Sequence, residues 1–265
     1  MAACVGSAAL GASWMTALAV LARGQHPQLF VVGDDAWQVV LIEHRDHRIV
    51  ILNGEFEQSP ETEIDRVCSV LRQRIDVVAG AGLALSLLSN DFRHRRSVGS
   101  VIQLDGSPGQ VSSTNFVPMT EPIAISVGDI DVQARPLPAT QWDQDTNGGV
   151  SWIAHVQVGQ VVVAMAPSLD LIAQHASIET TLAIAPAGDL GSMKRSLPDV
   201  AVAINARSAN RPADSQSRID TDPQGLLLVR IFPQDIAGFV FRDGRLILPD
   251  WTQPARGAPP TYSSS

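Results

Sequence analysis

Residues 29–54 read LFVVGDDAWQVVLIEHRDHRIVILNG, and this stretch decides the class of fold. Three apolar runs, at 29–32, 37–42 and 49–52, are separated by short polar segments. Short runs rich in Val, Ile and Leu that are bounded by turn residues are typical of β-strands. The stretch therefore predicts a set of three antiparallel strands.

The next segment adds helices to this sheet. Residues 61–74 place Ile64, Val67, Val70 and Leu71 at helical spacing, and acidic side chains lie in the first turn. A short apolar strand is predicted at 75–78, followed by a turn at 79–82 and a helix at 83–88. Strand, turn and helix in succession indicate an α/β layer. Another strand is expected at 98–104, then a loop at 105–114.

The second half resembles the first in kind, with many short strands and few helices. We expect one helix at 169–176 and strands at 123–125, 132–135, 151–158, 161–165, 181–184, 200–204, 225–232, 238–242 and 245–248. Two β-rich halves with few helices predict an α/β (α+β) sandwich of two sheets covered by helices. The domain is expected to span residues 25–250, and the Pro-, Gly- and Ser-rich tail at 251–265 is predicted to be disordered.

The first 22 residues contain no charged side chain, and about 20 apolar residues are enough to cross a bilayer as a helix. We therefore predict that residues 1–24 form one N-terminal apolar helix that anchors the protein in a membrane. A cleaved signal peptide and a buried helix are the alternatives. Arg23 is the only basic residue nearby, so the side of the membrane on which the domain lies stays open.

Charge and cysteine content exclude some classes of protein. The 265 residues carry a formal net charge of −8, which argues against nonspecific nucleic-acid binding by the whole surface. One short basic cluster, Arg93, Arg95 and Arg96, is interpreted as a solvated loop or helix end, with DNA binding as the weaker alternative. Cys4 and Cys68 are the only cysteines, so a disulfide framework is not expected.

The order of these features resembles one known family. LFVVGDDAWQVVLI looks like its Asp-Val-Gly-Gln-Gly-Asp-Ala strand and turn, with Asp35-Ala36 matching the last two residues. RIVILNGE resembles its Leu-Ile-Asp-Gly-Gly, with Asn53-Gly54 in the place of Asp-Gly. DTNGGVSWIAHVQVGQVVVAMAPS resembles its Asn-x-x-Ser block, with Asn147 and Ser151 kept. The family is the C-terminal domain of ComEC-type bacterial DNA-uptake membrane proteins, a metallo-β-lactamase-like domain that follows membrane helices.

The resemblance implies an αββα sandwich and an association with a membrane channel protein and DNA uptake (competence). It also exposes a departure. In the family a His-x-(His/Asp)-x-Asp-His motif follows the strand that matches RIDVV, and its side chains bind metal. Here AGAGLALSLL follows at 79–88, and it offers no metal ligand. The later ligand positions read Ala166-Pro167-Ser168, and Asp189 is the sole carboxylate near the last one. We therefore expect a pseudoenzyme without metal or cofactor, in which Leu83, Leu85 and Leu88 line the former metal pocket.

Three functional hypotheses follow. The first is a catalytically degenerate, membrane-tethered domain that acts by binding or scaffolding. The second is an active metal-dependent hydrolase of phosphodiester bonds, with a rearranged site drawn from His44, Asp46, His47 and Asp189. The third is a structural or partner-binding module unrelated to nucleic acid. The HRDH run at 44–47 is interpreted first as a polar hairpin turn, and His155 and His175 as a packed or rim histidine and a helix-end histidine.

Overall fold

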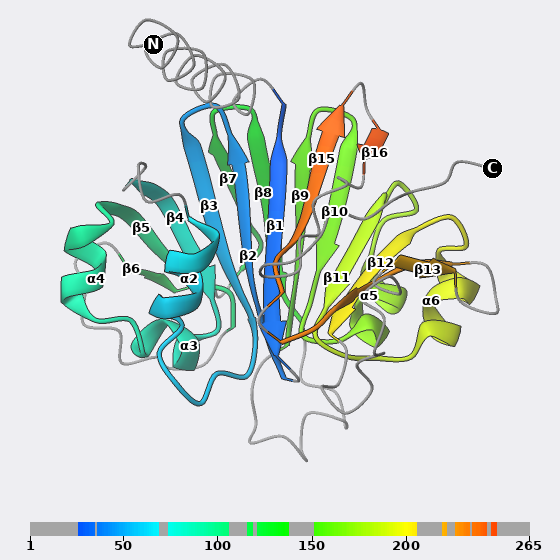
Figure 1. Ribbon diagram of the computed structural model, residues 1–265, viewed down its shortest axis with the longest axis horizontal. Helices are drawn as coiled ribbons and strands as arrows, with labels where there is room; N and C mark the ends of the chain where they lie inside the picture. Colours follow the sequence, from blue (N-terminus) through cyan, green and yellow to red (C-terminus); the bar gives the residue numbers. More distant parts are fainter. Residues whose placement is uncertain are drawn as a thin grey trace, which may run out of the picture.

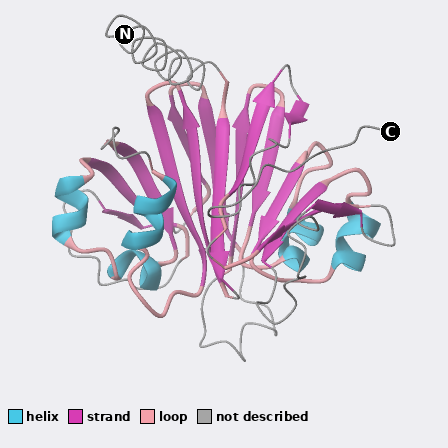
Figure 2. Cartoon of the chain, in the orientation of Figure 1, coloured by secondary structure: helices cyan, strands magenta, loops and turns pink. Residues whose placement is uncertain are grey.

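The computed structural model describes residues 26–34, 36–68, 74–105, 116–118, 121–137, 151–205, 219–221, 226–233, 235–242 and 245–247. Within them, two eight-stranded sheets pack face to face, and helices cover the outer face of each sheet (Figures 1 and 2). The layer order is therefore helix, sheet, sheet, helix. This confirms the predicted αββα sandwich.

The first sheet has the strand order β16-β15-β1-β2-β3-β4-β5-β6. Strands β1, β2 and β3 are antiparallel, as the sequence predicted, whereas β3 to β6 run parallel. The bounds are β1 Gln28–Asp34, β2 Trp37–His44, β3 His47–Gly54, β4 Ile75–Gly80, β5 Val98–Gln103, β6 Phe116–Pro118, β15 Ala237–Arg242 and β16 Arg245–Ile247.

The second sheet has the order β13-β14-β12-β11-β10-β9-β8-β7. Strands β7 to β10 form an antiparallel meander, and β10, β11, β12 and β14 are parallel. The bounds are β7 Ile123–Val127, β8 Ile130–Pro136, β9 Trp152–Val158, β10 Val161–Met165, β11 Leu182–Ala185, β12 Ala201–Asn205, β13 Ile219–Thr221 and β14 Leu227–Ile231.

The described helices are short and lie outside the sheets (Figure 2). Those beside the first sheet are α2 Glu61–Val67, α3 Gly82–Ser86 and α4 Asn90–Arg95, and those beside the second are α5 Leu169–His175 and α6 Leu190–Ser196. Ser89, Ser168 and Asp189 cap the N-termini of α4, α5 and α6 by accepting hydrogen bonds from backbone N–H groups of the first turn. These polar residues therefore begin the helices.

Three apolar clusters hold the layers together. The largest lies between the sheets and includes Leu29, Val31, Trp152 and Phe239, all fully buried or nearly so. A second lies between the first sheet and its helices, and a third between the second sheet and α5 and α6. Because the central strands are buried on both faces, they read as continuous apolar runs rather than alternating ones.

Several local predictions need correction. Ala79 and Gly80 belong to β4 and not to a turn, since they pair with Ile102 and Gln103 of β5. The helix predicted at 61–74 is described only as far as Val67, where Cys68 is its C-terminal cap in an extended conformation. Helices α4 and α6 and strands β6 and β13 were not predicted.

The N-terminal segment 1–25 and the tail 248–265 lie outside the described residues, so the predicted membrane helix and disordered tail stay predictions. Among the described residues, none of the helices is long and apolar enough to cross a membrane.

Candidate functional site

The carboxyl ends of the parallel strands of both sheets meet at the lower edge of the sandwich in Figure 1. This edge is a common place for sites in open α/β sheets, because loops that leave parallel strands converge there. It is also where the family resemblance would place metal ligands. Three neutral amides from three strands meet at it: Gln38 at the start of β2, Asn53 at the end of β3 and Asn205 at the end of β12.

These three side chains form one hydrogen-bonded network between the sheets. Gln38 Nε2 donates to Asn205 Oδ1 and to the carbonyl of Ala185, each at 3.0 Å. Asn53 Nδ2 donates to Gln38 Oε1 at 3.3 Å. Gln38 and Asn53 are both fully buried. The network therefore pairs most of its buried polar groups, with Asn53 Oδ1 the exception among the described residues, and it joins the first sheet to the second.

Asn205 also holds the turn between β1 and β2. Its Nδ2 donates to the carbonyl of Asp34 at 3.0 Å and to that of Trp37 at 2.9 Å. Gly33 makes this approach possible, since a Cβ atom there would lie 2.5 Å from Asn205 Oδ1. The carbonyls of Asp34 and Trp37, on either side of the β1–β2 connection, are thus held by a residue from the other sheet.

The segment after β4 has a different role from the one expected. Leu85 and Leu88 are buried, but they belong to the cluster under α2, α3 and α4, on the outer side of the first sheet. Leu83 is 66% exposed. The three leucines therefore do not line a former metal pocket. The backbone N–H of Gly82 donates to Asp105 Oδ1 at 2.7 Å, so a carboxylate from the end of β5 anchors the start of α3.

Asp189 caps helix α6. Its carboxylate accepts hydrogen bonds from the backbone N–H groups of Gly191 and Ser192 and from the Ser192 hydroxyl, at 2.8 to 3.0 Å. These bonds, that of the Ser192 hydroxyl first, lower the pKa of Asp189. The side chain is exposed and committed to the helix end.

His44, Asp46 and His47 lie at the opposite end of the sandwich, in the β2–β3 hairpin (Figure 1). Arg45 and Asp46 form the exposed turn, and His44 pairs with His47 across it. The two histidines therefore share one face of the hairpin. The polar hairpin itself is confirmed.

Each of these histidines lies beside an aspartate from another part of the chain. His44 Nδ1 lies 3.4 Å from Asp129 Oδ2 in the β7–β8 turn, and His47 Nδ1 lies 3.6 Å from Asp76 Oδ2 on β4. Burial lowers the pKa of His44, although the Asp129 carboxylate raises it. We call His44, His47, Asp76 and Asp129 the hairpin clamp. It tethers the β2–β3 hairpin to β4 and, through Asp129, to the second sheet.

The four metal candidates are thus divided between the two ends of the molecule. Among the described residues, there is no group of three or more His, Cys, Asp or Glu side chains placed to hold a metal ion. Neutral amides that bond to one another do not fit a catalytic metal centre, which needs anionic or imidazole ligands with free lone pairs.

The three arginines of the basic cluster lie at the end of α4 and make intramolecular contacts. Arg96 is buried, and its Nε donates to Asp65 Oδ1 at 2.7 Å. Arg95 is half-exposed and pairs with Asp65 Oδ2 at 2.9 Å. Arg93 donates to the carbonyl of Leu85 at 3.3 Å. Their binding of DNA stays a prediction, with Arg95 the most accessible of the three.

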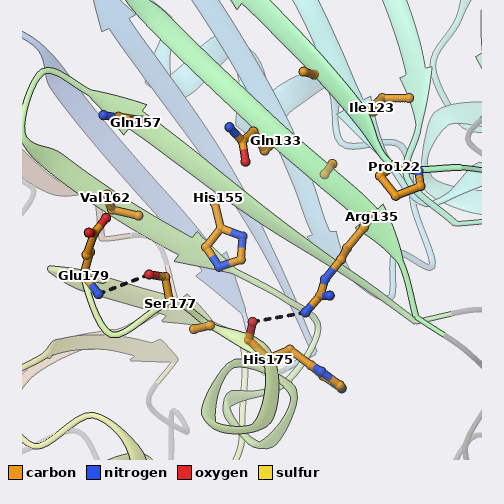
Figure 3. A pocket seen from close by; sticks show the side chains of 13 residues that line it. Pro122, Ile123, Gln133, Arg135, His155, Gln157, Val162, His175, Ser177 and Glu179 are labelled. Atoms are coloured by element: carbon orange, nitrogen blue, oxygen red, sulfur yellow. Dashed lines mark hydrogen bonds between the residues drawn. The ribbon is translucent and has the colours of Figure 1, made fainter.

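A cavity that the sequence did not indicate lies on the outer face of the second sheet, beside the end of α5 (Figure 3). Gln133 and Arg135 on β8 and His155 and Gln157 on β9 line it. The sequence does carry a signal for this group: polar residues alternate with apolar ones in both β8 and β9. This spacing places the four polar side chains on one face of the sheet. Sequence reasoning took His155 alone, as a packed or rim histidine, and so missed the group.

Comparison with known proteins bears on the fold only. The family models and the curated proteins give no match. Among solved structures, a variant of CmlA β-hydroxylase is 13% identical, with 67% of this chain and 45% of that chain covered and a TM-score of 0.41. The Rm3 metallo-β-lactamase is 14% identical, with 52% and 57% covered and a TM-score of 0.35.

A metallo-β-lactamase from Cronobacter sakazakii is 14% identical, with 52% of this chain and 58% of that chain covered and a TM-score of 0.33. This chain therefore spans about half the length of each of these proteins. Because identities and TM-scores are low, the αββα assignment rests on the layers and the strand order described above.

Proposed function

We propose that this chain is a catalytically degenerate, metallo-β-lactamase-like domain that acts by binding or scaffolding and is tethered to a membrane by residues 1–22. The observation that carries the first part is the amide network of Gln38, Asn53 and Asn205. It occupies the edge at which the resemblance would place metal ligands, and it joins the two sheets there.

The chemistry of the network supports this proposal. Amide groups are neutral and cannot offset the charge of a divalent cation, and here the side-chain oxygens of Gln38 and Asn205 already accept hydrogen bonds within the protein. The sandwich is held by three apolar clusters, so burial of apolar area supplies stability without a metal. Loss of the metal motif is therefore compatible with a stable fold.

Metal content tests the proposal against the alternative of an active phosphodiesterase. We would purify the full chain in detergent without chelator, offer it Zn²⁺ and Mn²⁺, and measure bound metal by elemental analysis alongside thermal melting. We expect no stoichiometric metal and no rise in Tm. One or two bound ions per chain with a raised Tm would overturn the proposal.

A matched pair of variants would locate any metal that did bind. His44→Ala/His47→Ala removes candidates at one end of the sandwich, and Asp189→Ala removes the candidate at the other. Glu57→Gln, an exposed substitution, is the control and should keep any bound metal. If one of the two variants loses the metal and the control keeps it, the ion lies at that variant's end of the sandwich, which would favour the hydrolase.

The membrane and DNA-uptake parts of the proposal rest on the uncharged segment 1–22 and on the family resemblance. We expect the full chain to stay in the membrane fraction after alkaline extraction. We also expect its partner in the membrane to be a channel protein. Deletion of the gene in a competent host should reduce DNA uptake, and unchanged uptake would remove that link.

The net charge of −8 favours a second candidate, a partner-binding module unrelated to nucleic acid. Binding of single-stranded DNA separates the two. A salt-sensitive affinity that falls in Arg93→Gln/Arg95→Gln would support the DNA link, whereas no affinity at low salt would favour the second candidate. Arg96 is left intact in this test because its buried ion pair with Asp65 stabilises the fold.

A further inference from the structure

The cavity on the outer face of the second sheet has the size and lining of a small-molecule site. Its volume is about 640 Å³, within the range of roughly 300 to 1,000 Å³ that is usual for ligand pockets. Strands β8 and β9 form its floor, and the end of α5 with the following loop forms one wall (Figure 3). None of its lining residues belongs to the amide network or to the hairpin clamp, so neither accounts for it.

Opposite charges lie at the two sides of this cavity. Figure 3 shows Arg135 on one side of His155 and Glu179 on the other. One guanidinium nitrogen of Arg135 donates to the carbonyl of His175 at 3.2 Å, which holds the side chain at the cavity wall. The backbone N–H of Glu179 donates to Ser177 Oγ at 3.3 Å, which fixes the loop that carries the carboxylate.

Between these charges lies the imidazole of His155. Its Nε2 is buried and makes no hydrogen bond within the described part of the chain. Burial lowers the pKa of His155, and the nearby Arg135 lowers it further, so the ring is neutral at pH 7. A neutral imidazole adds no charge between Arg135 and Glu179, so these two side chains set the charges at the two sides of the cavity.

The remaining lining combines apolar and uncharged polar groups. Pro122, Ile123, Val162 and Ala176 contribute apolar surface, and Gln133 contributes an amide beside His155. A polyanion such as a nucleotide would meet the Glu179 carboxylate, and a simple amine would meet the Arg135 guanidinium. A ligand that carries a negative group at one end and a positive group at the other can avoid both like-charge contacts.

We propose that this cavity binds a small zwitterion of the amino-acid or short-peptide class, with its carboxylate at Arg135 and its ammonium group at Glu179. The pair gives charge complementarity at both ends, and the guanidinium offers a planar set of donors that fits a carboxylate. The inference concerns a face of the molecule that the proposed function does not use, and it stands whether or not the strand-end edge binds metal.

Three probes of matched shape test it by isothermal titration calorimetry on the full chain. Trialanine carries both charges, N-acetyl-trialanine lacks the ammonium group and trialanine amide lacks the carboxylate. We expect trialanine to bind tightest, with each blocked peptide weaker by roughly tenfold or more, as expected for the loss of a charge-assisted hydrogen bond. Equal affinities for all three peptides, or none for trialanine, would overturn the proposal.

Two variants then assign the ends. Arg135→Gln should weaken trialanine and N-acetyl-trialanine and leave trialanine amide unchanged, whereas Glu179→Gln should weaken trialanine and trialanine amide and leave N-acetyl-trialanine unchanged. Arg195→Gln and Glu57→Gln, exposed and outside the cavity, are the controls and should bind all three peptides as the parent does. Because all four side chains are exposed, the variants should keep the parental Tm. Effects that do not follow the blocked end of the peptide would contradict the assignment.

Discussion

Different interactions connect the elements at the two ends of the sandwich. At the strand-end edge, Gln38, Asn53 and Asn205 use neutral hydrogen bonds, and two of the three are fully buried. At the opposite end, the hairpin clamp places two histidines beside two aspartates, and Asp129 is half-exposed there. Both join elements that are far apart in the sequence, but only the clamp consists of residues that look reactive.

The difference shows why charge is a poor guide to function in this chain. Residues 44–47 contain metal-capable side chains in close succession, yet they join a hairpin to its neighbours. The edge where chemistry is expected carries amides, which are neutral and hydrogen-bond to one another. A buried amide network left half-paired is costly, whereas an exposed ion pair is worth little. The two ends should therefore respond very differently to mutation.

The largest effect is expected at the amide network. Gln38→Ala removes the hydrogen bonds of Gln38 with Asn205, Ala185 and Asn53 and leaves buried partners unpaired. We expect a loss of roughly 2 to 4 kcal/mol in the free energy of unfolding, measured by urea denaturation. Gln157→Ala, an exposed glutamine on β9, is the control and should change it by less than about 0.5 kcal/mol. Equal losses in the two variants would show that the network does not stabilise the edge.

A smaller effect is expected at the clamp, and it should differ between the two aspartates. Asp76 is nearly buried and accepts from the backbone N–H of Arg48 at 2.9 Å, so Asp76→Asn should cost roughly 1 to 3 kcal/mol. Asp129 is half-exposed, so Asp129→Asn should cost less than about 1 kcal/mol.

The salt dependence of the same denaturation curves provides a check. The cost of Asp129→Asn should shrink in high salt, because salt screens exposed ion pairs, and that of Asp76→Asn should persist. The opposite ranking would mean that the clamp is held mainly by its exposed pair.

The smallest effect is expected from pH. Burial lowers the pKa of His44, His155 and His175 in the folded protein relative to 6.5 in the unfolded chain. The unfolded state therefore binds more protons as the pH falls below neutral, and stability should decline from pH 7 toward pH 5. His155→Gln should flatten this decline, as measured by Tm across the range. An unchanged profile would show that other groups dominate it.

Most of the strands were predictable because their signal is local. Apolar runs bounded by turns identified β1, β2 and β3 and most of the second sheet, and the predicted order of layers is confirmed. The cavity beside α5 was missed, since Arg135, His155 and Glu179 come from three separate elements and each alone resembles a surface residue. The misplaced leucines have a related cause. Apolarity predicted that Leu85 and Leu88 are buried, but not on which side of the sheet.

What the sequence alone determined is the set of extended and helical segments and the absence of ligands after β4, because both depend on neighbouring residues. What the tertiary structure decided is which segments meet. In the folded protein β15 pairs with β1 in the first sheet, and Gln38 contacts Asn205, which lies 167 positions away in the chain. Side-chain periodicity specifies which face of a strand is apolar, but the partner strand is chosen by the burial of whole sheets against each other, and no local pattern records that choice.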